Sequence, residues 1–174
     1  MAATVSDGIW ELMIYTFIDE IVNTETPSSA AGAKAEITKS HKIKMCGFEI
    51  GSKLIDSCTV MIDKSEKFSD EVSIMKVIAT EFWGQLFSKS ISNLQTNNKG
   101  KFKLQDDGCR LLGKLVDVSD NEEENRKQKV MRGFIVDFIT GLVKGALNNL
   151  NLEANCSGEW DEIKRVLEIS IEIK

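Results

Sequence analysis

The sequence has almost none of the histidine that enzymes and metal sites commonly use. Its 174 residues include one histidine, His41, and the lysines at positions 39, 42 and 44 predict that its side chain is exposed. A Ser-His-Asp or Cys-His arrangement would have to use this residue, and no nucleophile motif points to it. No glycine-rich loop of the kind that binds phosphate is present either. We therefore expect no catalytic residue, no metal ligand and no cofactor in this chain.

Long apolar runs and paired cysteines are absent as well. Charged or strongly polar residues interrupt every apolar stretch before it reaches the roughly 20 residues that cross a bilayer. The cysteines form no C-x-x-C pair and follow no signal peptide, which predicts reduced thiols in the cytosol. They are Cys46, Cys58, Cys109 and Cys156. Basic residues number 22 against 27 acidic ones, and this net charge of -5 argues against a nucleic-acid-binding protein.

The chain does contain strong helical patterns, the first of them from about Ser6 or Asp7. Its large apolar residues repeat at i, i+3, i+4 and i+7, the spacing of one helix face: Trp10, Met13, Ile14, Phe17, Ile18, Ile21 and Val22. The segment from Asn23 to Gly32 contains the only proline together with small polar residues. We interpret it as a flexible loop, at about residues 23–36.

Two further helices carry glycines four residues apart. One begins at about Ser40 and contains Gly47 and Gly51, and the other runs from Val130 to Leu150 and contains Gly141 and Gly145. Each glycine costs a helix about 1 kcal/mol relative to alanine. A neighbouring backbone that comes close, or a local kink, would each explain the first pair. For the second pair we expect tight helix packing inside a core.

A central helix is predicted from Ser69 or Asp70 to Leu94. Polar residues from Gln95 to Lys99, followed by Gly100, would end it. Residues 101–105 alternate between polar and apolar as in a strand with one buried face. Asp107-Gly108 then predicts a two-residue hairpin, with Cys109 to Leu112 as the returning strand.

The last part of the chain predicts a second hairpin. The charged run at 117–129 is typical of a solvated loop or of the exposed start of a helix, and the helix from Val130 to Leu150 follows it. A short strand near Leu152 to Cys156, a turn around "SGEWDE" and an alternating strand from Arg165 to Lys174 complete the chain. We predict one α+β domain, residues 1–174, with four main helices and a small antiparallel sheet made of two hairpins.

Three stretches of the sequence resemble a known family. They are "CGFEIGSKLID" (Cys46–Asp56), "EFWGQLFSKSISNLQTNNKGKFKLQDDGCRLL" (Glu81–Leu112) and "FITGLVKGALNNLNL" (Phe138–Leu152). Their order and spacing are similar to those of the small subunits of the TRAPP vesicle-tethering complex, in the subunit-six branch. The resemblance implies the same α+β fold and favours the close-approach explanation of Gly47 and Gly51.

The resemblance also implies a function. It implies a non-catalytic structural subunit, cytoplasmic and peripheral at Golgi or ER-Golgi membranes, in a complex that tethers vesicles and promotes nucleotide exchange on a Rab-type GTPase. An acylatable small-subunit paralogue would be its heterodimer partner, and a homodimer is possible in isolation. One paralogue carries a lipid-modified cysteine between its second and third helices, where this sequence has Lys67. No acyl ligand is therefore expected here.

In that family the first two helices form the heterodimer interface. The residues that we predict for this interface are Trp10, Met13, Phe17, Met45, Phe48, Gly51 and Ile55. The alternative function is a small-molecule sensor, because distant relatives of the fold bind ligands among their helices. Its pocket would use aromatic residues of the core: Phe82, Trp83, Phe134 and Phe138.

Overall fold

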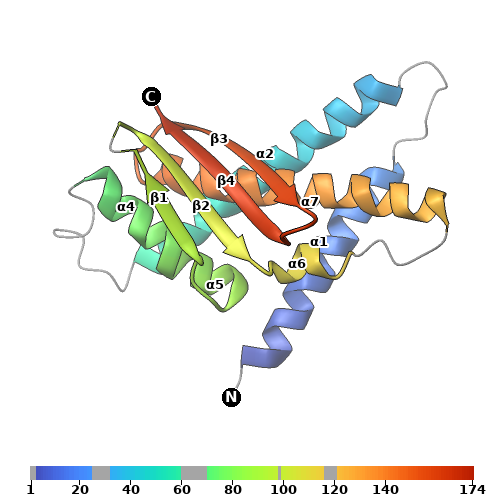
Figure 1. Cartoon of the computed structure of the whole chain (residues 1–174), viewed down its shortest axis with the longest axis horizontal. Helices are drawn as coiled ribbons and strands as arrows, with labels where there is room; N and C mark the ends of the chain where they lie inside the picture. The colour runs from blue at the N-terminus through green and yellow to red at the C-terminus, as the bar shows by residue number, and fades with distance from the viewer. Residues whose placement is uncertain (1–2, 25–31, 60–69, 98, 116–120) are drawn as a thin grey trace.

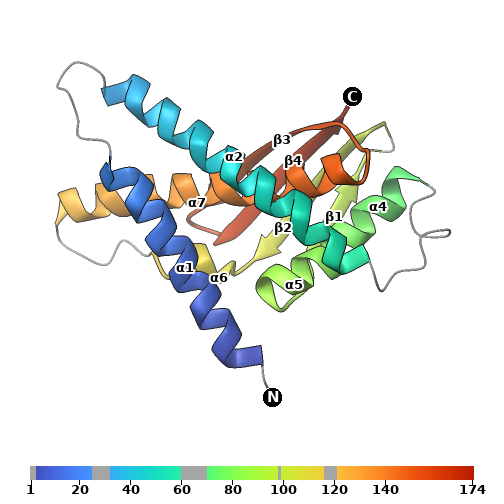
Figure 2. The same ribbon diagram turned by 180° about the vertical axis from the view of Figure 1, so that it is seen from behind.

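The computed structural model describes residues 3–24, 32–59, 70–97, 99–115 and 121–174. A four-stranded sheet covers one side of the long helix α7 (Glu122–Asn149), and α2 (Gly32–Thr59) packs on the other side of α7. Helix α1 (Ala3–Thr24) crosses α7 on the same side as α2 (Figures 1 and 2). The outer face of the sheet carries no helix in the described part of the chain.

The sheet is antiparallel, with the strand order β1-β2-β4-β3. Its strands are β1 (Asn93–Thr96), β2 (Lys101–Asp107), β3 (Ala154–Asp161) and β4 (Val166–Ile173). Apolar side chains alternate with polar ones along β2 and β4, so that one face, which includes Leu104 and Ile169, is buried against the helices. The predicted α+β class with a small antiparallel sheet is confirmed, and so is the hairpin predicted for the last part of the chain, formed by β3 and β4.

The glycine pairs of α2 and α7 face each other. A Cβ atom on any of the four glycines would lie less than 3.0 Å from backbone of the opposite helix. The glycines are Gly47 and Gly51 on α2, and Gly141 and Gly145 on α7. Only a residue without a side chain permits this separation, so the close-approach interpretation of the spacing is confirmed.

The predicted central helix is shorter than expected. Asp70 caps its start by accepting a hydrogen bond from the Ser73 amide at 2.6 Å. The helix then runs through α4 (Glu71–Val77), a π-helical turn (Ile78–Phe82) and α5 (Trp83–Phe87), and Ser88 ends it in the left-handed conformation, with φ 55°. The prediction of helix as far as Leu94 was wrong, because Leu94 belongs to β1 and pairs with Leu104.

The predicted hairpin at Asp107-Gly108 was also wrong. Gly108 does adopt a left-handed conformation, with φ 71°, but it leads into the short helix α6 (Arg110–Gly113) and not into a strand. Strand β2 pairs instead with β1, on the far side of a turn that contains Gly100, and with β4. A glycine with positive φ permits a change of direction without deciding which element follows it.

Several predicted boundaries also moved. Helix α2 begins at Gly32, ahead of the predicted Ser40. Asn121 caps α7, so the charged residues 122–129 form its mostly exposed first turns, in agreement with one of the two interpretations of that run. Strand β3 extends to Asp161 through residues that we had placed in a turn. Residues 25–31 of the predicted flexible loop lie outside the described residues.

Candidate interaction surface

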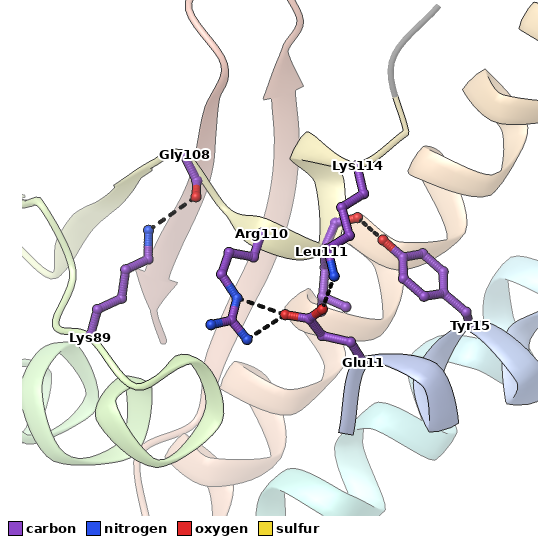
Figure 3. A network of polar contacts seen from close by, with 7 residues as sticks. All are labelled: Glu11, Tyr15, Lys89, Gly108, Arg110, Leu111 and Lys114. Atoms are coloured by element: carbon purple, nitrogen blue, oxygen red, sulfur yellow. Dashed lines mark hydrogen bonds and ion pairs between the residues drawn. The ribbon is translucent and has the colours of Figure 1, made fainter. Parts of the chain in front are cut away.

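A set of polar contacts fixes α1 against α6 (Figure 3). The Glu11 carboxylate, only 5% exposed, accepts a hydrogen bond from Arg110 Nε at 2.7 Å and forms an ion pair with Lys114. One turn further along α1, the Tyr15 hydroxyl donates a hydrogen bond to the Leu111 carbonyl oxygen. These contacts determine which side of α1 faces the rest of the chain.

Burial and charge act on Glu11 in opposite directions. Burial of the carboxyl raises its pKa, but hydrogen bonds from Lys114 and Arg110, and the charges of both, outweigh this, so the net shift is downward from 4.5. The carboxylate is therefore charged at neutral pH. Burial, together with the Glu11 charge, raises the pKa of Tyr15 to about 12, so its hydroxyl stays protonated and can donate.

A second group of contacts holds the segment that leads into α6. Lys89 Nζ donates to the carbonyl oxygens of Asp107 and Gly108 at 2.9 and 3.4 Å, and forms an ion pair with the buried Asp106. Trp83 Nε1 donates to the same carboxylate at 3.1 Å. The segment from Asp106 to Lys114 is thus fixed both by α1 and by the helix that precedes β1.

With its inner side fixed in this way, α1 presents an apolar outer side. Ile9, Leu12 and Met13 are 62%, 66% and 53% exposed, whereas Ile14 and Ile18, on the opposite side of the helix, are 3% and 0% exposed. The sides differ because residues three or four apart share a helix face. We call Ile9, Leu12 and Met13 the outer face of α1.

Helix α2 also exposes large apolar side chains. Ile37, Met45 and Ile50 are 70%, 45% and 37% exposed, while Ile43 and Ile55 of the same helix are completely buried. Large exposed apolar residues thus occur on both α1 and α2, and exposed apolar patches commonly mark contacts with another protein.

The structure distributes the seven predicted interface residues over three environments. Met13 and Met45 are exposed, in agreement with a contact surface. Trp10, Phe17 and Phe48 are half-buried, and the ring of Phe17 lies 6.1 Å from that of Phe138 in α7. Gly51 lies against the α7 backbone and Ile55 in the core, so the chain's own residues cover both.

Trp10 has a further feature. Its Nε1 atom is shielded from solvent and has no hydrogen-bond partner among the described residues. Buried N–H groups in folded proteins nearly always have an acceptor. The contacts of this indole are thus incomplete in the described part of the chain.

The sequence analysis did not select Ile9, Leu12, Ile37 or Ile50. Apolar residues lie on both sides of α1, so the sequence does not reveal which side faces the core. The side that faces the core is the one that carries the charged residue Glu11, and a charged residue would normally be placed on the outside. The partners of Glu11 are Arg110 and Lys114, which lie 99 and 103 residues further along the chain. No local pattern could have indicated that contact.

The aromatic residues of the alternative, ligand-sensing function lie in the packed core. Phe82 and Trp83 are 0% exposed, and Phe138 and Phe134 are 1% and 4% exposed. A cavity of about 450 Å³ between α1 and α7 is lined by Phe134 together with Val22, Val130, Met131 and charged residues. Phe82, Trp83 and Phe138 do not line this cavity, so it is not the pocket of four aromatic residues that the sensing function predicts.

The described residues offer little for chemistry. They contain no group of three or more histidine, cysteine or carboxylate side chains able to bind a metal ion. His41 is exposed on α2, as predicted, and the four cysteines are unpaired, with Cys58 and Cys109 buried and Cys46 and Cys156 half-buried. Across the described ranges, every helix is too short or too polar to cross a membrane.

Comparison with known proteins identifies the family. The family model described as "Transport protein particle (TRAPP) component" matches residues 12–174. The chain belongs to this family, as its three sequence motifs indicated.

Its relatives include subunits numbered six. The chain is 30% identical over 153 residues to "Trafficking protein particle complex subunit 6b" of Danio rerio, covering 88% of each protein. It is 35% identical over 118 residues to subunit 6B of Mus musculus, covering 68% of each, and 28% identical over 108 residues to subunit 6A of Homo sapiens, covering 62% of each. The chain is therefore similar to subunit six of the trafficking protein particle complex.

A solved structure shares the fold. The crystal structure of a trafficking protein particle complex subunit 3 from Naegleria fowleri, covalently bound to palmitic acid, matches with a TM-score of 0.73 over 98% of this chain and 96% of that one. At 12% identity the likeness concerns the fold alone. Lys67 stands in this sequence where one paralogue of the family carries its lipid-modified cysteine, and it lies outside the described residues.

Proposed function

We propose that this chain is a non-catalytic structural subunit of a TRAPP-type complex, and that it pairs with an acylatable small-subunit paralogue through the outer sides of α1 and α2. The complex would tether vesicles and promote nucleotide exchange on a Rab-type GTPase at ER-Golgi or Golgi membranes. The chain would reach those membranes as part of the complex and would remain cytoplasmic.

One observation carries the pairing proposal. Ile9, Leu12 and Met13 are all more than half exposed on a helix whose rotation is fixed by the buried Glu11. A helix held in one orientation presents these side chains to solvent continuously, and their burial by a partner would be favourable at about 25 cal/mol per Å².

The proposal changes the set of interface residues that the sequence predicted. Met13 and Met45 remain in it, Ile9, Leu12 and Ile50 join it, and Trp10, Phe17 and Phe48 form its half-buried border. Gly51 and Ile55 would act behind it, since they set the position of α2 on α7.

The test is co-purification and analytical ultracentrifugation with the acylatable paralogue from the same proteome. Leu12→Glu and Met13→Glu should each leave the chain folded and weaken pairing by at least about 100-fold, because an unpaired charge in a desolvated contact commonly costs several kcal/mol. Ile163→Glu is the matched control, since it places the same charge on another exposed apolar residue, at the turn between β3 and β4. Circular dichroism would establish that every variant is folded.

Unchanged pairing of both α1 variants would place the interface elsewhere. Pairing lost equally in the Ile163→Glu control would show that added negative charge, and not contact, is responsible.

The role in exchange is tested separately. The isolated chain should not accelerate nucleotide release from Rab GTPases. When the chain is omitted from a reconstituted complex, the amount of assembled complex should fall more than the exchange rate of the complex that still assembles.

A further inference from the structure

Strand β3 forms one edge of the sheet (Figure 1). It pairs with β4 in an uninterrupted antiparallel register, from Ala154 opposite Ile173 to Asp161 opposite Val166. On its other side it has no strand neighbour in the described part of the chain. We call this side the open edge of β3, and it shares no residue with the outer face of α1 or with the exposed residues of α2.

We propose that the open edge of β3 binds an extended segment of a partner protein as a fifth strand. The segment carries lysine or arginine at the positions that lie on the outer face of the sheet. The unpaired backbone groups of β3 carry the first part of this inference, and the charge of Glu159 carries the second.

The backbone groups of β3 alternate between the two sides of the strand, as in every antiparallel sheet. The Lys174 amide donates to the Glu153 carbonyl oxygen at 3.0 Å, just before the strand begins, so the odd-numbered residues of β3 are those that bond with β4. The N–H and C=O groups of Cys156, Gly158 and Trp160 therefore point to the open edge. Among the described residues, no side chain and no other backbone segment forms a hydrogen bond with them.

The open edge also lacks the usual protection against other strands. Folded proteins commonly protect such an edge with proline, lysine, a bulge or a very short strand. The eight residues of β3 include no proline and no lysine, and the register with β4 contains no bulge. The strand at the opposite edge, β1, has only four residues. β3 is thus the edge that is suited to the addition of a strand.

Helix α7 holds the open edge in place. Gly158 lies directly on this helix, because a Cβ atom there would be 2.4 Å from Thr140 Oγ1 and 2.8 Å from Val136 Cγ1. The Thr140 hydroxyl is itself fixed, since it donates to the Val136 carbonyl oxygen at 2.7 Å. An edge that is already ordered loses little conformational entropy when another strand binds to it.

The charges on the outer face of the sheet indicate which segment fits. The lysines of β2 pair with glutamates of β4, Lys103 with Glu168 at 2.7 Å and Lys101 with Glu172 at 2.9 Å. Glu159 of β3 lies on the same face, opposite Glu168, and its carboxylate has no ion pair or hydrogen bond within the described ranges. A lysine or arginine beside it on an added strand would supply the missing opposite charge.

A second copy of this chain fits the open edge less well. In every antiparallel register that joins the open edges of two β3 strands, Glu159 would lie beside Glu153, Glu159 or Asp161 of the other copy, directly or diagonally. Like charges at such positions are destabilising. A basic segment avoids this repulsion.

The experiment measures amide hydrogen exchange of the full chain by NMR, alone and with three peptides of seven residues. The basic peptide is Ac-Thr-Lys-Val-Lys-Val-Lys-Thr-NH2, the acidic peptide has glutamate in place of lysine, and the proline peptide has proline in place of valine. In the free chain, the amides of Cys156, Gly158 and Trp160 should exchange at least about tenfold faster than those of Ser157 and Glu159, which bond with β4. A saturating amount of the basic peptide should slow the first group at least about tenfold.

Two matched substitutions test the backbone contact. Cys156→Pro removes one N–H group from the open edge and none of the bonds with β4, and proline is tolerated on an edge strand at such a position. It should weaken binding of the basic peptide at least about tenfold, whereas Cys156→Val, which keeps the N–H group, should not. Circular dichroism would establish that both variants are folded.

A further substitution tests the charge and does not alter the backbone. Glu159→Lys should reverse the preference of the chain, so that the acidic peptide binds more tightly than the basic one. This test remains decisive even if Cys156→Pro does not fold.

Four results would overturn the inference. Exchange that no peptide slows would mean that the open edge binds no strand, and equal binding of the proline peptide would mean that charge alone attracts the basic one. Equal binding of the acidic peptide would remove the role of Glu159. Self-association of the free chain that Cys156→Pro abolishes, measured by sedimentation, would assign the open edge to a second copy. None of these results depends on pairing through α1 and α2.

Discussion

Gly51 of α2 lies directly against the backbone of Leu142 in α7. A Cβ atom at position 51 would come within 2.7 Å of the Leu142 Cα, and the three other glycines of the two helices make equivalent approaches. Neither backbone can move away without separating the two longest helices of the described chain, because no flexible side chain lies between them.

Gly51→Ala should therefore destabilise the chain. We expect a loss of about 2–4 kcal/mol, since overpacking of a tight contact costs typically 1–3 kcal/mol and occasionally more. Gly133→Ala in α7 is the matched control, because a Cβ there meets nothing within 4 Å. That variant should gain up to about 1 kcal/mol from the higher helix propensity of alanine. Urea denaturation of both variants measures the difference, and equal stabilities would show that α2 and α7 can separate freely.

Glu11 should make the stability of the chain depend on pH on the acid side. Because its folded-state pKa lies below 4.5, the folded chain binds this proton less tightly than the unfolded chain does. The stabilisation is therefore complete above pH 4.5 and is lost as the pH falls through the folded-state pKa. Glu11→Gln should cost about 1–3 kcal/mol at neutral pH and flatten the acid-side decline. Thermal melts of both proteins from about pH 6 to pH 3 test this, and parallel curves would contradict it.

Asp106 should behave in the opposite way. Burial raises its pKa above 3.8 in spite of Lys89 and Trp83, so its ionisation weakens the folded state as the pH rises from 3.8 through the raised value. Asp106→Asn should be as stable as the wild type or more stable at neutral pH, because the amide oxygen can still accept from Trp83 Nε1. Asp106→Ala should lose about 1–3 kcal/mol, because that indole N–H then has no acceptor. Chemical denaturation compares the three proteins, and equal loss in both variants would mean that the charge itself is stabilising.

The rotation of α1 should depend on Tyr15. Tyr15→Phe removes the hydrogen bond to the Leu111 carbonyl oxygen and keeps the ring, at an expected cost of about 1 kcal/mol. Hydrogen exchange of α1 amides should accelerate more than exchange of α7 amides, because the lost contact joins α1 to α6 alone. Uniform acceleration would indicate that α1 unfolds only together with the whole chain.

Sequence periodicity identified the helices because each buries a continuous apolar side. It failed at β1, where Asn93, Gln95 and Thr96 are polar and the strand is recognised only by its pairing with β2. It also failed at Asp107-Gly108, because a glycine that permits a turn does not reveal whether a strand or a helix follows. Strand β2 pairs with β4, which lies far away in the sequence, and the residues around β2 carry no signal of this pairing.

The candidate interaction surface was predicted only in outline. The sequence indicated α1 and α2, and Met13 and Met45 are exposed there. Leu12 was missed because its side of α1 becomes the outer one only when Glu11, a charged residue, lies on the inner side. Gly51 was assigned to the surface because glycine spacing indicates a close contact without indicating which backbone provides it.

The four glycines between α2 and α7 also affect how such a chain can change in evolution. Every substitution along this contact adds atoms where there is no room, so the contact offers no series of small changes by which it could be remodelled. Met45 and Ile50 lie on α2 outside it and can be exchanged without altering the separation of the two helices. Duplicated copies of the gene could therefore acquire different binding partners while their helix packing stayed identical, and sequence divergence should concentrate on the solvent side of α2.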